Sequence, residues 1–167
     1  MAQAQTDTTP NIWAAAAAGL VAGLVASFVM DRFQAGVAAL SSSSSDSDAE
    51  PATEKAADKV SQVVVGHPVS DDRKPLAGQA VHYALGAGLG IVYVVAAEYR
   101  PTLTAGYGTA FAVANTALLD EAAVPAAGLG DAPWKTPPST HLYSVASHIV
   151  FGTVTEGVRR VLREWMR

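Results

Sequence analysis

The chain has 167 residues, of which 50% are hydrophobic and only 16% charged, below the charged share of an ordinary soluble domain. Its formal net charge of −4 argues against a nucleic-acid-binding surface, and its lack of cysteine excludes disulfides, thiolate metal sites and a cysteine nucleophile. The length suits one domain, and the apolar composition favours a membrane protein.

The chain begins with a polar tail, residues 1–11, that we expect to be disordered. Residues 12–30 carry no charge, and they are long enough for a first membrane span over about 12–32. A cleaved signal peptide is the alternative, but the segment lacks a basic start and its apolar run is longer than a signal peptide needs. Gly19 and Gly23 form a GxxxG step, which is typical of close helix packing in membranes.

Residues 34–75 are interpreted as a linker that contains one amphipathic helix. The linker includes a low-complexity serine tract. In residues 51–65, apolar side chains share one helical face, and charged side chains lie largely off it. That face consists of Ala52, Ala56, Val60, Val63 and Val64. The pattern fits a short helix resting on the membrane surface, and a helix packed on the bundle fits it equally well.

The longest apolar stretch covers about 76–98 and carries no charge before its last residue. As a helix of about 22 residues it would measure roughly 33 Å, enough to cross a bilayer core. One face repeats at four-residue spacing and consists of Gly78, His82, Gly86 and Gly90. We expect this face to pack against the span at 141–160, because helices in lipid associate through close backbone approach.

Two further spans complete the predicted bundle. The third, over about 102–124, contains Asn115, and Pro125 should end or kink it. The fourth, over about 141–161, ends on an arginine cluster, which favours cytoplasmic termini. We therefore predict an all-α integral membrane protein: a four-helix bundle with one short amphipathic surface helix, in a single domain over residues 12–167.

Polar side chains from three spans fall at one membrane depth. Counting along each span places His82 about 9 Å, His148 about 10 Å and Asn115 about 12 Å from the face that carries the long linker. Ionisable groups at this depth should be paired, so the layer is a candidate proton- or ion-handling site. Hydrogen bonding that only holds the bundle together is the alternative, and a metal site is a more distant one. The layer and its neighbours comprise His82, Asn115, Asp120, Glu121, His141 and His148.

A second charged cluster is expected at the opposite face of the membrane. Its members are Glu98, Arg100, Glu156, Arg159 and Arg160. Glutamate with arginine at three- and four-residue spacing favours ion pairs on a helix, and we interpret the cluster as a structural belt at the headgroups. The sequence lacks a nucleophile motif, a phosphate loop and a dinucleotide fingerprint, so we predict no catalytic residues, no metal and no cofactor.

Several short motifs occur in a fixed order between Lys55 and Arg163. They are VHY at 81–83 with AE at 97–98, VPAAGL at 124–129, the proline pair at 137–138 and SHIVFGTVTEGVRR at 147–160. In these motifs the chain resembles the YagU-like family of bacterial inner-membrane proteins, a domain of unknown function. The resemblance implies a multi-pass protein of the bacterial inner (plasma) membrane and supplies no catalytic or binding residues.

The sequence thus predicts a small membrane protein that is not an enzyme and that contacts the lipid bilayer and no nucleic acid. The first hypothesis is a response to protons or ions through the intramembrane His, Asn and carboxylate layer. The alternative is a structural or accessory subunit that docks through its glycine ridges onto a second copy or a larger membrane complex. A membrane metalloprotein is the distant alternative.

Overall fold

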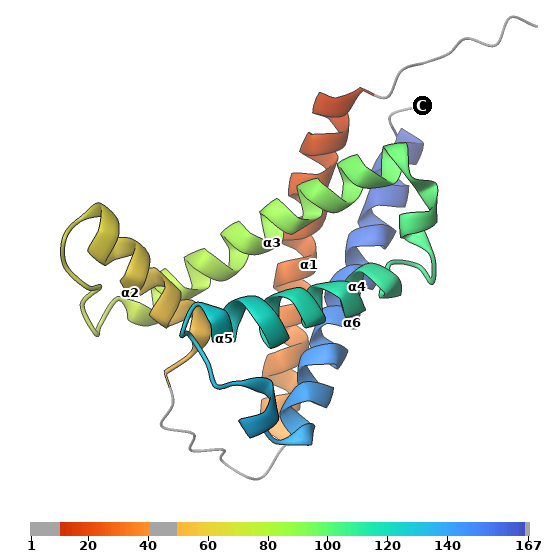
Figure 1. Ribbon diagram of the computed structural model, residues 1–167. Helices are drawn as coiled ribbons and strands as arrows, with labels where there is room; N and C mark the ends of the chain where they lie inside the picture. The colour runs from red at the N-terminus through yellow and green to blue at the C-terminus, as the bar shows by residue number, and fades with distance from the viewer. Residues whose placement is uncertain (1–10, 41–49, 166–167) are drawn as a thin grey trace, which may run out of the picture.

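The computed structural model describes residues 11–40 and 50–165, and these ranges consist of helices joined by turns and loops, without a strand (Figure 1). The all-α prediction is confirmed within these ranges, whereas residues 1–10 of the predicted tail and the serine tract lie outside them. The helical elements are α1 (Ile12–Leu40), α2 (Ala52–Val64), α3 (Lys74–Tyr99), η1 (Pro101–Thr104), α4 (Thr109–Asn115), the π-helix η2 (Thr116–Ala123), α5 (Val124–Ala126), η3 (Pro133–Lys135) and α6 (Pro138–Trp165).

Three long helices, α1, α3 and α6, organise the molecule (Figure 1). α1 lies between the other two, runs antiparallel to both, and is crossed obliquely by α3. The start of α1 and the end of α6 lie at one end of the molecule, where Asn11 and Arg163 line the same cleft. By length and composition, α1 and α3 are the two described helices apolar enough to cross a membrane.

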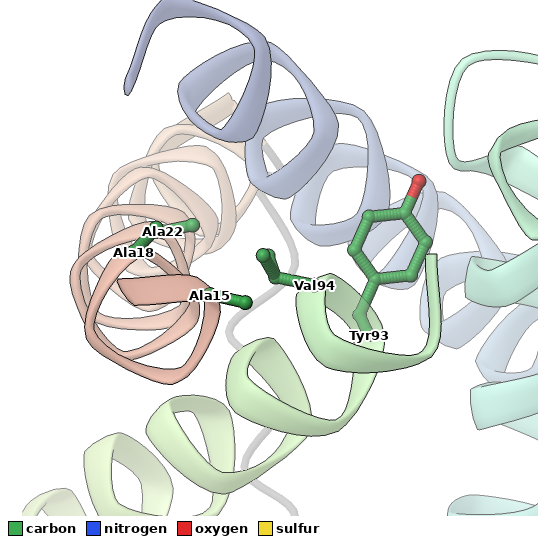
Figure 2. Packing of buried hydrophobic residues seen from close by; sticks show 5 residues of the cluster. All are labelled: Ala15, Ala18, Ala22, Tyr93 and Val94. Carbon is green, nitrogen blue, oxygen red and sulfur yellow. The ribbon is translucent and has the colours of Figure 1, made fainter. Parts of the chain in front are cut away.

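α1 has small residues inside and large apolar residues outside. Its large exposed side chains are Leu20, Val21, Leu24, Val25 and Phe28. Its buried residues are Ala15, Ala18, Gly19, Ala22, Gly23, Ala26, Ser27 and Met30. Figure 2 shows Val94 of α3 directed at the buried alanines, whereas Tyr93 points away from them. A helix of a soluble protein buries its large apolar side chains, so α1 has the reverse pattern.

α1 and α3 cross where two pairs of glycines meet. A methyl group built on Gly23 would lie 2.2 Å from the carbonyl oxygen of Gly86, and one built on Gly19 would lie 2.6 Å from that of Gly90. The two backbones are therefore in contact, with no room for a side chain between them. We expected the glycine face of α3 to pack against α6, but the structure places it chiefly on α1.

The close-packing glycine of α6, Gly152, contacts the start of α4 and is therefore not available to the glycine face of α3. Gly152 of α6 meets Gly108, at the start of α4, so closely that a methyl group on Gly108 would lie 2.3 Å from the Gly152 carbonyl oxygen. The remaining glycine of the predicted ridge, Gly78, lies against Glu54 of α2, where an added methyl group would come within 2.7 Å of the glutamate Cγ.

α2 packs on the start of α3 and buries Ala57. Lys74, which precedes the apolar stretch of α3, holds this contact: its Nζ lies 3.0 Å from Glu50 Oε1, 3.2 Å from Asp58 Oδ2 and 3.4 Å from Asp71 Oδ1. Hydrogen bonds to Glu50 and Asp58 hold the pKa of the Lys74 ammonium well above its ordinary value. The apolar side of α2 stays exposed at Val60, Val63 and Val64.

The predicted spans differ from the observed helices at their ends. α1 continues to Leu40, so residues 34–40 are helical and do not belong to a linker. α6 extends over residues 138–165, beyond the predicted 141–161 at both ends. Charged residues such as Asp31 end an apolar stretch without interrupting the backbone hydrogen bonds, so a helix can continue past them.

The third predicted span, 102–124, is divided in the structure. A 3₁₀ turn is followed by a chain reversal in which Gly106, Tyr107 and Gly108 have positive φ, and continuous helix begins only at Thr109. Left-handed residues end right-handed helix, which explains the break. In Figure 1, the run from α4 to α5 lies across α6 and not alongside it.

Within this run, η2 is π-helical. Thr116 Oγ1 donates a hydrogen bond to the carbonyl oxygen of Ala112 (3.1 Å), a contact that bends helices. Pro125 lacks an N–H, and its ring would collide with the carbonyl of Glu121 in a regular α-helix. Both features favour a locally widened helix just before the proline.

Candidate functional site

The structure divides the six predicted layer residues between two places. His82 faces α1, whereas the others lie where η2 and the end of α4 meet α6. Within residues 11–40 and 50–165, His82 forms no hydrogen bond or ion pair with Asn115 or His148, so the predicted single layer requires correction. Equal depth along separate helices does not bring side chains together when the helices cross obliquely, as α3 does.

His82 is paired with Asp31 of α1. Its Nε2 atom lies 3.2 Å from Asp31 Oδ1, without the alignment of a hydrogen bond. The other carboxylate oxygen of Asp31 accepts a hydrogen bond from Gln79 Nε2 (2.6 Å). His82, Asp31 and Glu54 line an open pocket of about 380 Å³ between α1, α2 and α3, so solvent protons can reach this pair.

His148 is held between α6 and η2. Its Nδ1 donates to the carbonyl oxygen of Ser144 (3.1 Å) and lies 3.5 Å from Asp120 Oδ2. The same Asp120 oxygen accepts a hydrogen bond from the Ser144 hydroxyl. Asn115 is the last residue of α4 and is buried. Its amide nitrogen has no hydrogen-bond partner among the described residues.

His141 has an acceptor at each ring nitrogen. Nδ1 lies 2.6 Å from Glu121 Oε1, and Nε2 lies 3.1 Å from the carbonyl oxygen of Pro133 in η3. A carbonyl oxygen can only accept, and an ionised carboxylate can only accept, so an imidazolium with two N–H donors satisfies both contacts. Neutral histidine has one N–H, so loss of the proton leaves one of the two contacts without its hydrogen bond.

The π-helix presents two consecutive acids, Asp120 and Glu121, to α6. One meets His148 and the other meets His141, seven residues apart on the same helix. Irregular turns of this kind are frequent at functional sites, where they change the direction of side chains. The sequence identifies both acids but not their distribution between the two histidines.

The predicted belt at the opposite end is a buried cluster. Glu156 is fully buried and accepts hydrogen bonds from Arg159 Nε (2.7 Å), Arg160 Nε (2.6 Å) and the Tyr93 hydroxyl (2.8 Å). Arg159 is also nearly buried. The expected ion pairs of Glu156 with Arg159 and Arg160 are present, but the carboxylate is buried among them and not exposed at a surface. Arg100 is exposed and has no ion pair within the described part of the chain.

The remaining members of this cluster link α3 and α6 further. Glu98 Oε1 lies 3.3 Å from Arg163 Nη1 and 3.7 Å from Arg159 Nη1. The Arg160 guanidinium lies 4.5 Å from the centre of the Tyr107 ring. The predicted belt does not include Tyr93, Tyr107 or Arg163, although Arg163 belongs to the arginine cluster expected at the end of the fourth span. A tyrosine inside an apolar stretch needs a partner for its hydroxyl, which is a signal for Tyr93.

Two further features bear on the sequence hypotheses. The α1 glycines, Gly19 and Gly23, pack against Gly90 and Gly86 of α3. Gly78, the first glycine of the α3 ridge, lies against α2. These ridges therefore do not present a free surface. Across the described ranges, no three His, Asp or Glu side chains gather in a group that could hold a metal ion.

Comparison with known proteins relates the chain to a protein family. Residues 57–157 match the family model described as a protein of unknown function (DUF1440), which covers more than half of the chain and agrees with the resemblance to the YagU-like family. No curated protein and no solved structure matches the chain. The chain therefore belongs to the DUF1440 family of proteins of unknown function.

Proposed function

We propose that this protein is a multi-span protein of the bacterial inner membrane whose helix bundle responds to pH through histidine–carboxylate pairs. The observation that carries the proposal is that three helix histidines each face a carboxylate on another helical segment. The pairs are His82 with Asp31, His148 with Asp120, and His141 with Glu121.

The membrane assignment is supported by the reversed packing of α1. Large apolar side chains on the outside of a helix are stable in lipid, and small residues inside allow the close backbone approach that associates helices there. α6 is 28 residues long and also long enough to span. Trp13 and Trp165 are exposed at the end where α1 begins and α6 ends, as interfacial tryptophans would be. We place that end in the cytoplasm because of its arginines.

The pH response follows from the charge of histidine. Histidine is the side chain whose ordinary charge change falls between pH 5 and 8. A protonated imidazole beside a carboxylate forms an ion pair, whereas a neutral imidazole beside the same carboxylate does not. Glu54 adds a second carboxylate to the pocket of His82, and Tyr83 lies edge-on to its ring. Protonation therefore strengthens contacts between α1 and α3 and between η2 and α6.

The pH response is favoured over the accessory-subunit alternative by the use of the glycines. A docking ridge must be free, and the α1 and α3 ridges pack on each other.

The proposal is tested by melting temperatures of the purified protein in detergent between about pH 5.5 and pH 8. The wild type should melt higher at the acidic end, because imidazolium–carboxylate attraction stabilises the fold only while histidine is protonated, and this stability is lost as pH rises. Combining His82→Gln, His141→Gln and His148→Gln should remove the difference. His67→Gln is the control, because exposed His67 contacts the Pro68 carbonyl oxygen and, among the described residues, no carboxylate. An unchanged pH difference in the triple variant would overturn the proposal.

A further inference from the structure

A cleft lies at the end of the molecule opposite the histidine pairs, where the start of α1 meets the ends of α3 and α6. Its volume is about 280 Å³. One wall is apolar and consists of alanines of α1, including Ala15 and Ala18, with Val94 of α3. The other wall carries Arg159 and Arg163, so the cleft combines hydrogen-bond donors with an apolar surface.

Arg159 retains a donor that the buried cluster does not use. Its side chain is 8% exposed, and its Nε and Nη2 atoms donate to Glu156. Its Nη1 atom is buried and has no hydrogen-bond partner among the described residues, since Glu98 Oε1 is 3.7 Å away. A buried guanidinium nitrogen without a partner is costly, and a bound anion would satisfy it.

The charges at the cleft also favour an anion. The charged residues that line the cleft are Arg159, Arg163 and Glu98, an excess of one positive charge. Glu156, which also binds Arg159, is buried and shared with Arg160, so it does not reverse this excess. α1 begins at the cleft, and the N-terminal end of a helix carries partial positive charge. Arg163 is half exposed, with its Nη1 3.3 Å from Glu98, so it can turn towards a ligand without unfolding the cluster.

We propose that this cleft binds the phosphate group of an anionic phospholipid. Arg159 Nη1 and the guanidinium of Arg163 would donate to the phosphate oxygens, and the wall of Ala15, Ala18 and Val94 would contact the glycerol and the first carbons of an acyl chain. The exposed Trp13 beside the cleft fits the headgroup level of a membrane. Free phosphate shares the same chemistry but cannot use the apolar wall.

The test measures the melting temperature of the full chain in detergent with phosphatidylglycerol, with phosphatidylcholine, or with inorganic phosphate. Phosphatidylglycerol should raise the melting temperature in a saturable way, and phosphatidylcholine should raise it less, because its choline offsets the phosphate charge. An equal rise with inorganic phosphate at the same concentration would overturn the lipid as ligand. No rise with any of the three would overturn the site.

Substitutions of the charged residues that line the cleft test whether phosphatidylglycerol binds there. Arg163→Gln should lower the apparent affinity for phosphatidylglycerol about tenfold, the usual scale of one charge-assisted hydrogen bond. Glu98→Gln should raise the affinity, because it removes the carboxylate that competes for both arginines. Arg100→Gln is the control, since Arg100 is exposed and has no ion pair within the described residues. Equal losses in Arg100→Gln and Arg163→Gln would indicate nonspecific attraction and contradict the proposal.

Discussion

Replacing Gly23 with alanine should lower the free energy of unfolding by about 3 kcal/mol, the upper range for overpacking a core. The added methyl group would lie 2.2 Å from the Gly86 carbonyl oxygen and 3.0 Å from the Ala87 Cα. Both are backbone atoms, so no side chain can turn aside, and α1 and α3 must move apart. The melting temperature in detergent, compared with the wild type, measures the loss.

The matched control for this change is Gly88→Ala. Gly88 lies on the same helix as Gly86, but a methyl group there meets nothing within 4 Å. Alanine has higher helix propensity than glycine, so the control should be neutral or stabilised by up to about 1 kcal/mol. Equal melting temperatures for Gly23→Ala and Gly88→Ala would show that the two helices do not cross at these glycines.

Glu156→Gln should destabilise the fold by about 3 kcal/mol or more, because it leaves buried arginine charge without its counter-charge. Glutamine has nearly the same size as glutamate, so the loss reports the charge and not a cavity. Arg159 is the more affected partner, since its side chain is 8% exposed, whereas Arg160 is half exposed and can turn to solvent. Unfolding in denaturant, followed by helical circular dichroism, measures the change.

Glu164→Gln provides the comparison, because Glu164 is exposed near the end of α6. Its replacement should change the free energy of unfolding by less than about 0.5 kcal/mol, as at ordinary surface positions. If both glutamine variants were equally stable, the carboxylate of Glu156 would not be buried against the arginines.

Apolar patterning predicts the helices of this chain well. The stretch at 76–98 is helical as expected, and the amphipathic segment predicted at 51–65 is helical over 52–64, because both patterns repeat at helical spacing. The third span is not continuous helix as predicted, because the reversal at 105–108 depends on left-handed backbone that composition does not reveal. The predicted end of the first span also differs, because the helix continues past Asp31 to Leu40.

Pairing between helices is harder to predict from sequence. The glycine repeat of α3 indicates close packing but not its partner, because Gly152 of α6 and Gly23 of α1 present comparable small surfaces. The same limit applies to the histidines. Depth counting placed His82 and His148 at one level, but the crossing angle decides the actual partners, and His82 meets Asp31 of α1.

The most direct test of the pH response follows the fluorescence of Trp134, which is next to the Pro133 carbonyl contacted by His141. The chain has three tryptophans, so Trp13→Phe with Trp165→Phe leaves Trp134 alone. In lipid nanodiscs, its emission should change in one sigmoidal step between about pH 5 and pH 8, as His141 loses its proton and one of its two contacts. His141→Gln should abolish the step, and His67→Gln should retain it. A flat profile in the parent, or an unchanged step in His141→Gln, would contradict the account.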